Sequence, residues 1–202
     1  MNGSVSMRGS LGMTLLRTRA PWSWRVRNTL RWDFLWGWFT YRLMLTLSHI
    51  TKIPCLLGKL SLVHTRADGR RVDYGVVSYR VVTTAFVNFL VDNLQTDTTE
   101  IGDFKYHDSG VGTTAEANGD TAMETTDGES RATGTQTEGA TANIYKSVGT
   151  ISYTTTKAIT EHGVFSQAAA GTLMDRSKFT AVNVVNGDSI QFSYELTASA
   201  GG

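Results

Sequence analysis

Residues 148–199, VGTISYTTTKAITEHGVFSQAAAGTLMDRSKFTAVNVVNGDSIQFSYELTAS, decide the fold class of this chain. Short runs of alternating apolar and polar residues are separated by turn signals, such as the Asn-Gly-Asp of residues 186–188. Near the end of the stretch, four apolar residues occupy every second position: Ile190, Phe192, Tyr194 and Leu196. This alternation is typical of an antiparallel sheet with one buried face. We therefore expect the stretch to form the centre of an antiparallel β structure.

Two predicted elements precede this stretch. Residues 56–65 alternate near their end, and residues 72–82 are rich in β-branched and aromatic residues. The dipeptide Asp68-Gly69 between the two runs predicts a β-hairpin. In residues 85–94 the apolar positions change to a helical period. The Thr residues just before them can accept a hydrogen bond from the first turn. We expect a helix of about three turns that packs on the sheet.

The remaining predicted strands are short and closely spaced. They cover residues 104–107, 129–138, 143–155, 159–165, 173–179 and 189–198. Strands at intervals of about 8–12 residues favour a sandwich or small barrel over βαβ units. The sequence therefore predicts a mainly β protein in which residues 55–202 form an antiparallel β sandwich, jelly-roll or immunoglobulin-like, with one short α-helix.

The charge distribution divides the chain near Pro54. Residues 1–54 contain eight basic residues, one acidic residue (Asp33) and all five tryptophans, whereas residues 55–202 contain eleven basic and seventeen acidic residues. So sharp an asymmetry marks a boundary. We expect residues 1–54 to be a basic, Trp-rich extension, helical or disordered, ahead of the sandwich domain.

Residues 34–50 (FLWGWFTYRLMLTLSHI) are the most apolar run, and four interpretations of them stay open. As a transmembrane helix the run is short and has Arg42 at its middle, which costs about 2.5–3.5 kcal/mol on insertion. As a signal peptide it lies too far into the chain and lacks a cleavage site. Residues 17–50 could instead form an interfacial helix or basic arm that contacts a membrane, nucleic acid or partner. The fourth interpretation is an extension unrelated to the fold, for instance from an upstream start codon.

The residues that could support chemistry form no known motif. Cys55 is the single cysteine, so the chain has no internal disulfide or multi-thiolate zinc site. The pairs His107-Asp108 and Glu161-His162 point to opposite faces if they lie on strands. The acidic residues of the loop around residues 120–129 are expected to be solvated. We predict no catalytic, cofactor-binding or metal residues, no cofactor, and a protein that is not an enzyme.

Two stretches, FKYHDSGVGTTAEANGDT (residues 104–121) and AITEHGVFSQAAAGTLMDRSKF (residues 158–179), resemble small structural proteins of tailed bacteriophages. The resemblance spans about residues 56–202 and leaves residues 1–54 unmatched. Met123 and Val164 stand where leucine is usual. The positions that fit are Gly110, Gly112, Thr113, Asp120, Thr121, Ala122, Glu161, Gly163, Phe165, Gly171, Thr172, Leu173, Arg176, Gly187 and Asp188.

The resemblance implies a non-enzymatic structural component of a virion, either a capsid decoration (cement) subunit or a tail or head-fibre subunit. Its partners would be other virion proteins and further copies of itself. Two alternatives stay open: a glycan- or surface-binding β-sandwich module with Tyr106, Tyr145 or Tyr153 as stacking platforms, and a protein anchored in a membrane by residues 34–50. For folding, we expect His162→Ala to be close to neutral.

Overall fold

The computed structural model describes residues 17–80, 82–95 and 104–200, which form ten strands and three helices. The helices are α1 (Trp22–Thr29), α2 (Trp32–Thr51) and α3 (Thr84–Gln95). The strands are β1 (Arg17–Arg19), β2 (Cys55–Thr65), β3 (Arg71–Arg80), β4 (Tyr106–Gly110), β5 (Ala132–Thr133), β6 (Thr135–Glu138), β7 (Ile144–Ser152), β8 (Lys157–Phe165), β9 (Leu173–Val184) and β10 (Ser189–Ser199).

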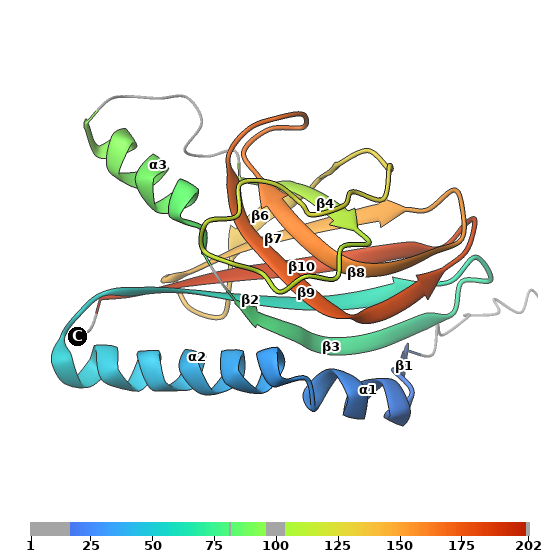
Figure 1. Ribbon diagram of the computed structural model, residues 1–202, viewed down its shortest axis with the longest axis horizontal. Coiled ribbons are helices and arrows are strands. Elements are labelled where there is room, and N and C mark those ends of the chain that lie inside the picture. The colour runs from blue at the N-terminus through green and yellow to red at the C-terminus, as the bar shows by residue number, and fades with distance from the viewer. Residues whose placement is uncertain (1–16, 81, 96–103, 201–202) are drawn as a thin grey trace, which may run out of the picture.

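The strands form two sheets that pack face to face (Figure 1). One has six strands in the order β1-β3-β2-β10-β7-β6, and the other has four in the order β5-β4-β8-β9. All neighbours are antiparallel except β1 and β3, which are parallel. The prediction of a mainly β, antiparallel, sandwich-like fold is confirmed.

Strand β10 lies at the centre of the larger sheet, hydrogen-bonded to β2 on one side and β7 on the other. The side chains of Ile190, Phe192 and Tyr194 are fully buried between the sheets, as their alternation predicts. Phe179 on β9 and Leu60 on β2 fill the same core. The period-2 pattern of β10 therefore correctly identifies the buried face of the larger sheet.

The predicted hairpin and helix are both present. Strands β2 and β3 pair around a turn in which Gly69 has a φ of 83° and the Arg70 N–H donates to Asp68 Oδ1 (2.9 Å). Helix α3 is capped by Thr83, whose Oγ1 accepts the Phe86 N–H (3.1 Å). The Phe86 ring packs edge-to-face on Phe104, which ties the start of α3 to the core.

Some boundaries differ from those predicted. The strand expected at residues 104–107 lies at Tyr106–Gly110, and residues 129–138 form two short strands in different sheets. Strand β9 runs on to Val184, five residues beyond the predicted end, because its second half pairs with the beginning of β8. Residues 96–103, between α3 and the region of β4, lie outside the described residues.

The described part of the N-terminal segment is mostly helical from Trp22 to Thr51, and α2 packs against the six-stranded sheet (Figure 1). Helix α2 packs mainly on β3, where Phe34 and Tyr41 contact Tyr79, and it reaches the end of β10, where the Tyr41 hydroxyl lies 3.2 Å from Thr197 Oγ1 and Ser48 Oγ lies 3.0 Å from Ser199 Oγ. Among the described residues, no helix is both long and apolar enough to cross a membrane. The boundary near Pro54 stays a prediction, but the segment before it is in contact with the sandwich.

Helix α1 closes the seam where β3 and β9, from different sheets, come together. The Asn28 side chain is buried: its Nδ2 donates to the Val77 carbonyl (3.1 Å) and its Oδ1 accepts the Thr180 N–H (3.0 Å). One turn earlier, the Trp24 indole N–H donates to the Ala181 carbonyl (2.8 Å). These side chains satisfy backbone groups that strand pairing leaves open at this seam.

Candidate functional site

The two histidines that sequence reasoning treated separately meet inside the sandwich. His107 Nδ1 on β4 lies 2.9 Å from His162 Nε2 on β8, and His107 Nε2 lies 2.8 Å from Ser147 Oγ on β7. All three side chains are fully buried, and the His162 ring stacks on Phe192. Positions 134 and 149, which face this cluster, require glycine because an added Cβ at either one would collide with His107.

Burial keeps both imidazoles neutral. Removal from water lowers the pKa of His107 to about 4 and takes the pKa of His162 well below its ordinary value, helped by the positive charge that His107 would carry. In one pair of tautomers, His162 Nε2–H donates to His107 Nδ1 and His107 Nε2–H donates to the Ser147 hydroxyl. Every ring N–H of the pair then has an acceptor. The pair is sealed from solvent. Because His162 is fully buried and bonded, the structure leads us to expect that His162→Ala destabilises the fold, contrary to the expectation from the sequence.

Glu161 and His162 point to opposite faces of β8, as predicted, and Glu161 organises the loop after β4. Glu161 is fully buried and accepts the backbone N–H groups of Gly112 (3.1 Å) and Thr125 (2.8 Å). It also accepts Nε of Arg176 on β9 (2.7 Å). Arg176 in turn binds Asp120 (2.9 Å) and Glu124 (3.2 Å).

The acidic loop residues keep contact with solvent, as expected, because Glu124 is exposed and Asp120, Asp127 and Glu129 are partly exposed, but each of them is also paired. Besides the two carboxylates on Arg176, Asp127 accepts the Ser109 hydroxyl, and Glu129 accepts Lys157 Nζ (2.7 Å). Each carboxylate fixes a loop segment to a strand. Linear spacing did not show this because the partners lie 15 or more residues away in sequence.

Another buried carboxylate joins the turn between β2 and β3 to the turn between β9 and β10. Asp188, in the turn before β10, has its Oδ2 2.8 Å from His64 Nε2 and accepts the Ala67 N–H (2.8 Å) and the Val185 N–H (3.1 Å). These hydrogen bonds lower the pKa of Asp188 even though burial opposes them. Burial is also the largest influence on His64, whose pKa is lowered.

Several positions that carry the phage resemblance belong to these two networks: Gly110, Gly112, Asp120, Glu161, Arg176 and Asp188. Gly110 and Gly112 lie so close to Glu161 that a Cβ would collide with it. These positions hold loops on the sandwich.

The ionisable side chains gather nowhere into a metal site within the described part of the chain. His49 is exposed on α2, and the other three histidines are fully buried. Of the tyrosines expected as glycan platforms, Tyr153 is buried, and the Tyr145 hydroxyl donates to the Phe104 carbonyl (2.5 Å). Of these three tyrosines, Tyr106 has a partly exposed ring, and its hydroxyl makes no hydrogen bond within the described part of the chain.

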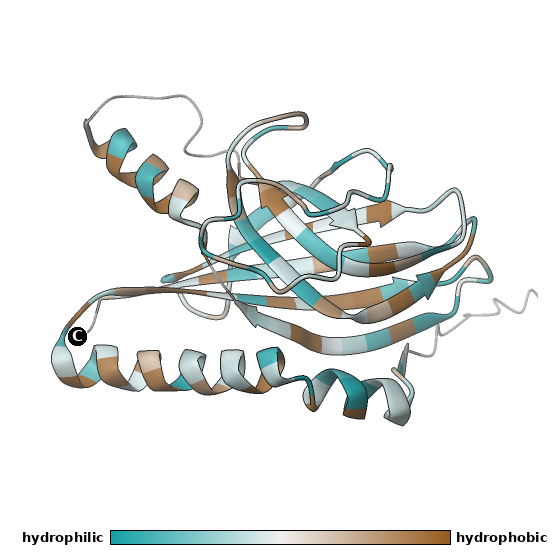
Figure 2. Cartoon of the chain, in the orientation of Figure 1, coloured by the Kyte–Doolittle hydropathy of each residue, from teal (hydrophilic) through white to brown (hydrophobic). Residues whose placement is uncertain are grey.

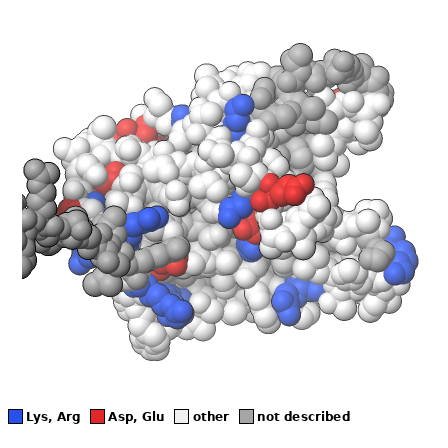
Figure 3. Space-filling model, turned by 180° about the vertical axis from the view of Figure 1, so that it is seen from behind, with Lys and Arg blue, Asp and Glu red and all other residues white. Residues whose placement is uncertain are grey.

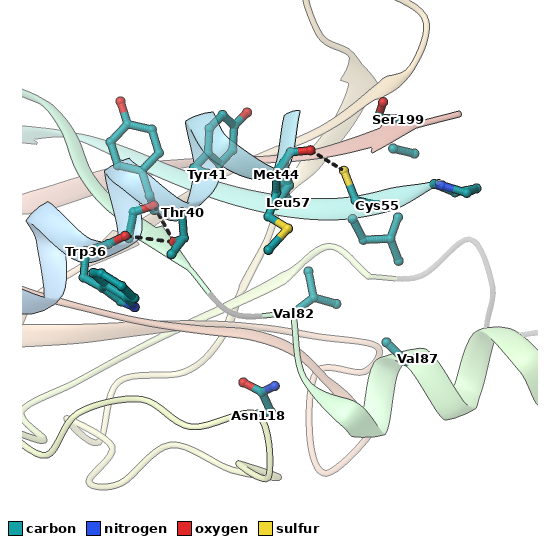
Figure 4. A pocket seen from close by; sticks show the side chains of 15 residues that line it. Trp36, Thr40, Tyr41, Met44, Cys55, Leu57, Val82, Val87, Asn118 and Ser199 are labelled. Carbon is teal, nitrogen blue, oxygen red and sulfur yellow. Dashed lines mark hydrogen bonds between the residues drawn. The ribbon is translucent and has the colours of Figure 1, made fainter. Parts of the chain in front are cut away.

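A hollow of about 630 Å³ lies between α2, the beginning of β2 and the beginning of α3 (Figure 4). We call it the end hollow. Its lining includes Trp36, Met44, Leu57, Val82, Val87 and Asn118. Polar atoms at its wall are already bonded: the Thr40 hydroxyl donates to the Trp36 carbonyl (2.8 Å) and the Tyr41 hydroxyl contacts Thr197. The end hollow is therefore an open and mainly apolar surface.

Cys55 borders the end hollow at the beginning of β2. Its side chain is half-buried, and Sγ lies 3.9 Å from the Met44 carbonyl. No base lies among the lining residues of the hollow, so the thiol has no partner there that would activate it.

Comparison with known proteins gives no assignment: no family model, no curated protein and no solved structure matches this chain.

Proposed function

We propose that this protein is a non-enzymatic structural component of a tailed-phage virion, a capsid decoration or a tail or head-fibre subunit, that works through protein–protein assembly. The observation that carries the proposal is the end hollow. It is open and apolar, and Met44 and Val87 at its wall are each more than 40% exposed. Such a surface suits apolar side chains of a partner protein.

The interior supports the same proposal. The buried polar residues bind one another, within the smaller sheet for Glu161 with Arg176 and between the two sheets for His107 with Ser147. Buried networks of this kind rigidify a fold without presenting a reactive group to a substrate. A rigid subunit with an exposed apolar hollow is suited to assembly.

The finer fold class is part of the proposal. The last strand, β10, lies between β2 and β7 and returns beside the first long strand, as in a Greek key. In an immunoglobulin domain the last strand lies at a sheet edge. The strand order therefore favours a jelly-roll sandwich over an immunoglobulin-like one.

The test is the presence of the protein in particles. Gradient-purified virions from the producing lysate are analysed by quantitative mass spectrometry, with the wild type compared to Val87→Glu and Met44→Glu. A carboxylate in the end hollow should reduce incorporation at least tenfold, because it would be buried against apolar side chains without a partner. Val185→Glu, at an exposed valine outside the hollow, is the matched control and should be incorporated normally.

Absence of the wild-type protein from virions would sink the proposal. Normal incorporation of both hollow variants would show that assembly uses another surface.

A further inference from the structure

The outward side of α2 is an apolar stripe that no described residue covers. Its members recur with a helical period and are all exposed: Trp32, Phe39, Leu43, Leu47 and Ile50. The opposite side of the helix carries Gly37 and Ser48, which are buried against the sheet. Apolar positions recur along the helix in Figure 2. Helix α2 therefore has one side on the protein and an apolar side in solvent.

The exposure of this stripe is large for a soluble surface. Trp32 is 77% and Ile50 71% exposed, and a helix of 20 residues is about 30 Å long. Two further apolar residues, Trp22 and Leu30, extend the exposed surface along α1. An apolar surface of this length is expected to have a partner.

The charges beside the stripe are basic. Arg25 and Arg27 on α1, Arg42 on α2, and Lys52 after it are all exposed. Asp33 is the single acidic residue of residues 1–54, and it is bonded to Arg31 (Nε to Oδ1, 3.0 Å). Lys and Arg side chains lie along the edge of the molecule that α1 and α2 form (Figure 3). The partner should therefore be apolar and anionic at once.

We propose that α1 and α2 together bind the surface of a lipid bilayer that contains anionic headgroups. The stripe would enter the boundary between headgroups and acyl chains, where tryptophan is favoured, and the flanking arginines would contact lipid phosphates. Because the opposite side of α2 is packed along the sheet, the helix would lie in the plane of the membrane surface. Anionic headgroups would repel the net negative charge of residues 55–202, so the sandwich would face away from the membrane.

The same charges disfavour two other partners. If α2 paired with α2 of a second copy, the basic side chains beside the two stripes would be brought together, which is repulsive. A nucleic acid would satisfy the arginines and could stack on Trp32 and Phe39, but it would leave the aliphatic Leu43, Leu47 and Ile50 in solvent. A bilayer satisfies the aliphatic stripe and the basic residues together. The end hollow is not required for this contact, so this inference is independent of the assembly proposal.

The tryptophans allow a direct measurement. All five lie between residues 22 and 38, and four of them are exposed: Trp22, Trp32, Trp36 and Trp38. The full chain is mixed with vesicles of phosphatidylcholine alone or of phosphatidylcholine with phosphatidylglycerol. We expect a blue shift of tryptophan emission and co-sedimentation with the anionic vesicles, both weakened by added salt.

Three variants locate the contact. Leu43→Asp should reduce vesicle affinity at least tenfold, because it places a carboxylate in the stripe. Arg25→Glu with Arg27→Glu should reduce affinity for anionic vesicles by about fivefold or more for each basic residue lost. Val185→Asp changes an exposed valine of the sandwich and should leave binding unchanged.

Equal binding by Leu43→Asp and wild type would overturn the inference, and so would failure of the wild type to bind either vesicle. Self-association that Leu43→Asp abolishes, without vesicle binding, would identify a second copy of the chain as the partner. Binding to single-stranded DNA without vesicle binding would identify a nucleic acid as the partner.

Discussion

At the scale of single residues, this protein depends on buried polar groups that hold distant segments together. Glu161 binds a loop and a strand at once, Asp188 joins two turns, and His107 connects β4 to β7 and β8. Each group is satisfied by specific partners, so its removal leaves another buried group unpaired. Such losses cost about 1–3 kcal/mol for neutral groups and more for charged ones.

The buried histidine pair makes stability depend on pH. The pKa of His107 is about 4 in the folded protein, below the ordinary 6.5, so the unfolded chain binds the proton more readily. The stabilisation is complete above pH 6.5 and decreases as the pH falls toward 4. We expect a loss on the order of 3 kcal/mol from this residue alone, measured as the free energy of unfolding in urea at several pH values.

The double variant His107→Gln/His162→Gln is the control, since glutamine hydrogen-bonds without titrating in this range. It should be less stable at pH 7 but should lose less stability between pH 6.5 and 5. If variant and wild type lose equal stability over that range, other groups cause the effect.

At the scale of elements, α1 acts as a closing piece between the sheets. Strands β3 and β9 belong to different sheets, and α1 supplies side-chain partners for their backbone groups at the seam. The Trp24 ring adds an edge-to-face contact with Tyr74 on β3 (centroids 4.5 Å apart). A short basic helix thus protects backbone that would otherwise be open to water or to other chains.

Removing the Asn28 side chain should weaken this seam. Asn28→Ala leaves the Val77 carbonyl and the Thr180 N–H without their partner, at a cost of about 1–3 kcal/mol in the free energy of unfolding. Arg27→Ala, on the exposed side of the same helix, should change stability by less than about 0.5 kcal/mol. Denaturant titrations of both variants make the comparison, and equal effects would contradict a specific role for Asn28.

At the scale of the whole molecule, the helices α1 and α2 pack against the sandwich. Their contacts run from Ala20, whose N–H donates to the Asp73 carbonyl (2.8 Å), to Ser48 beside Ser199. The apolar stripe and the end hollow both use residues of α2. The segment before Pro54 therefore contributes to the core on one side and to the candidate surfaces on the other.

Deletion of residues 1–54 should destabilise the sandwich. The fragment of residues 55–202 loses the partners of Val77 and Ala181 and exposes apolar side chains of β3, so we expect a lower unfolding midpoint and a tendency to aggregate. Thermal unfolding and light scattering of the fragment and the full chain provide the measurement. A fragment as stable and monodisperse as the full chain would mean that the division near Pro54 separates two independent units.

The sequence by itself determined the β class, the β2–β3 hairpin, helix α3 and the buried face of β10. These depend on local signals: period-2 alternation, an Asp-Gly turn and a threonine cap. Only the tertiary structure decided that His107 meets His162, that Glu161 holds the loop before β5, and that α1 fills the seam between the sheets. Those contacts join residues 15 to 152 positions apart, and nothing in local spacing specifies which distant strand lies opposite.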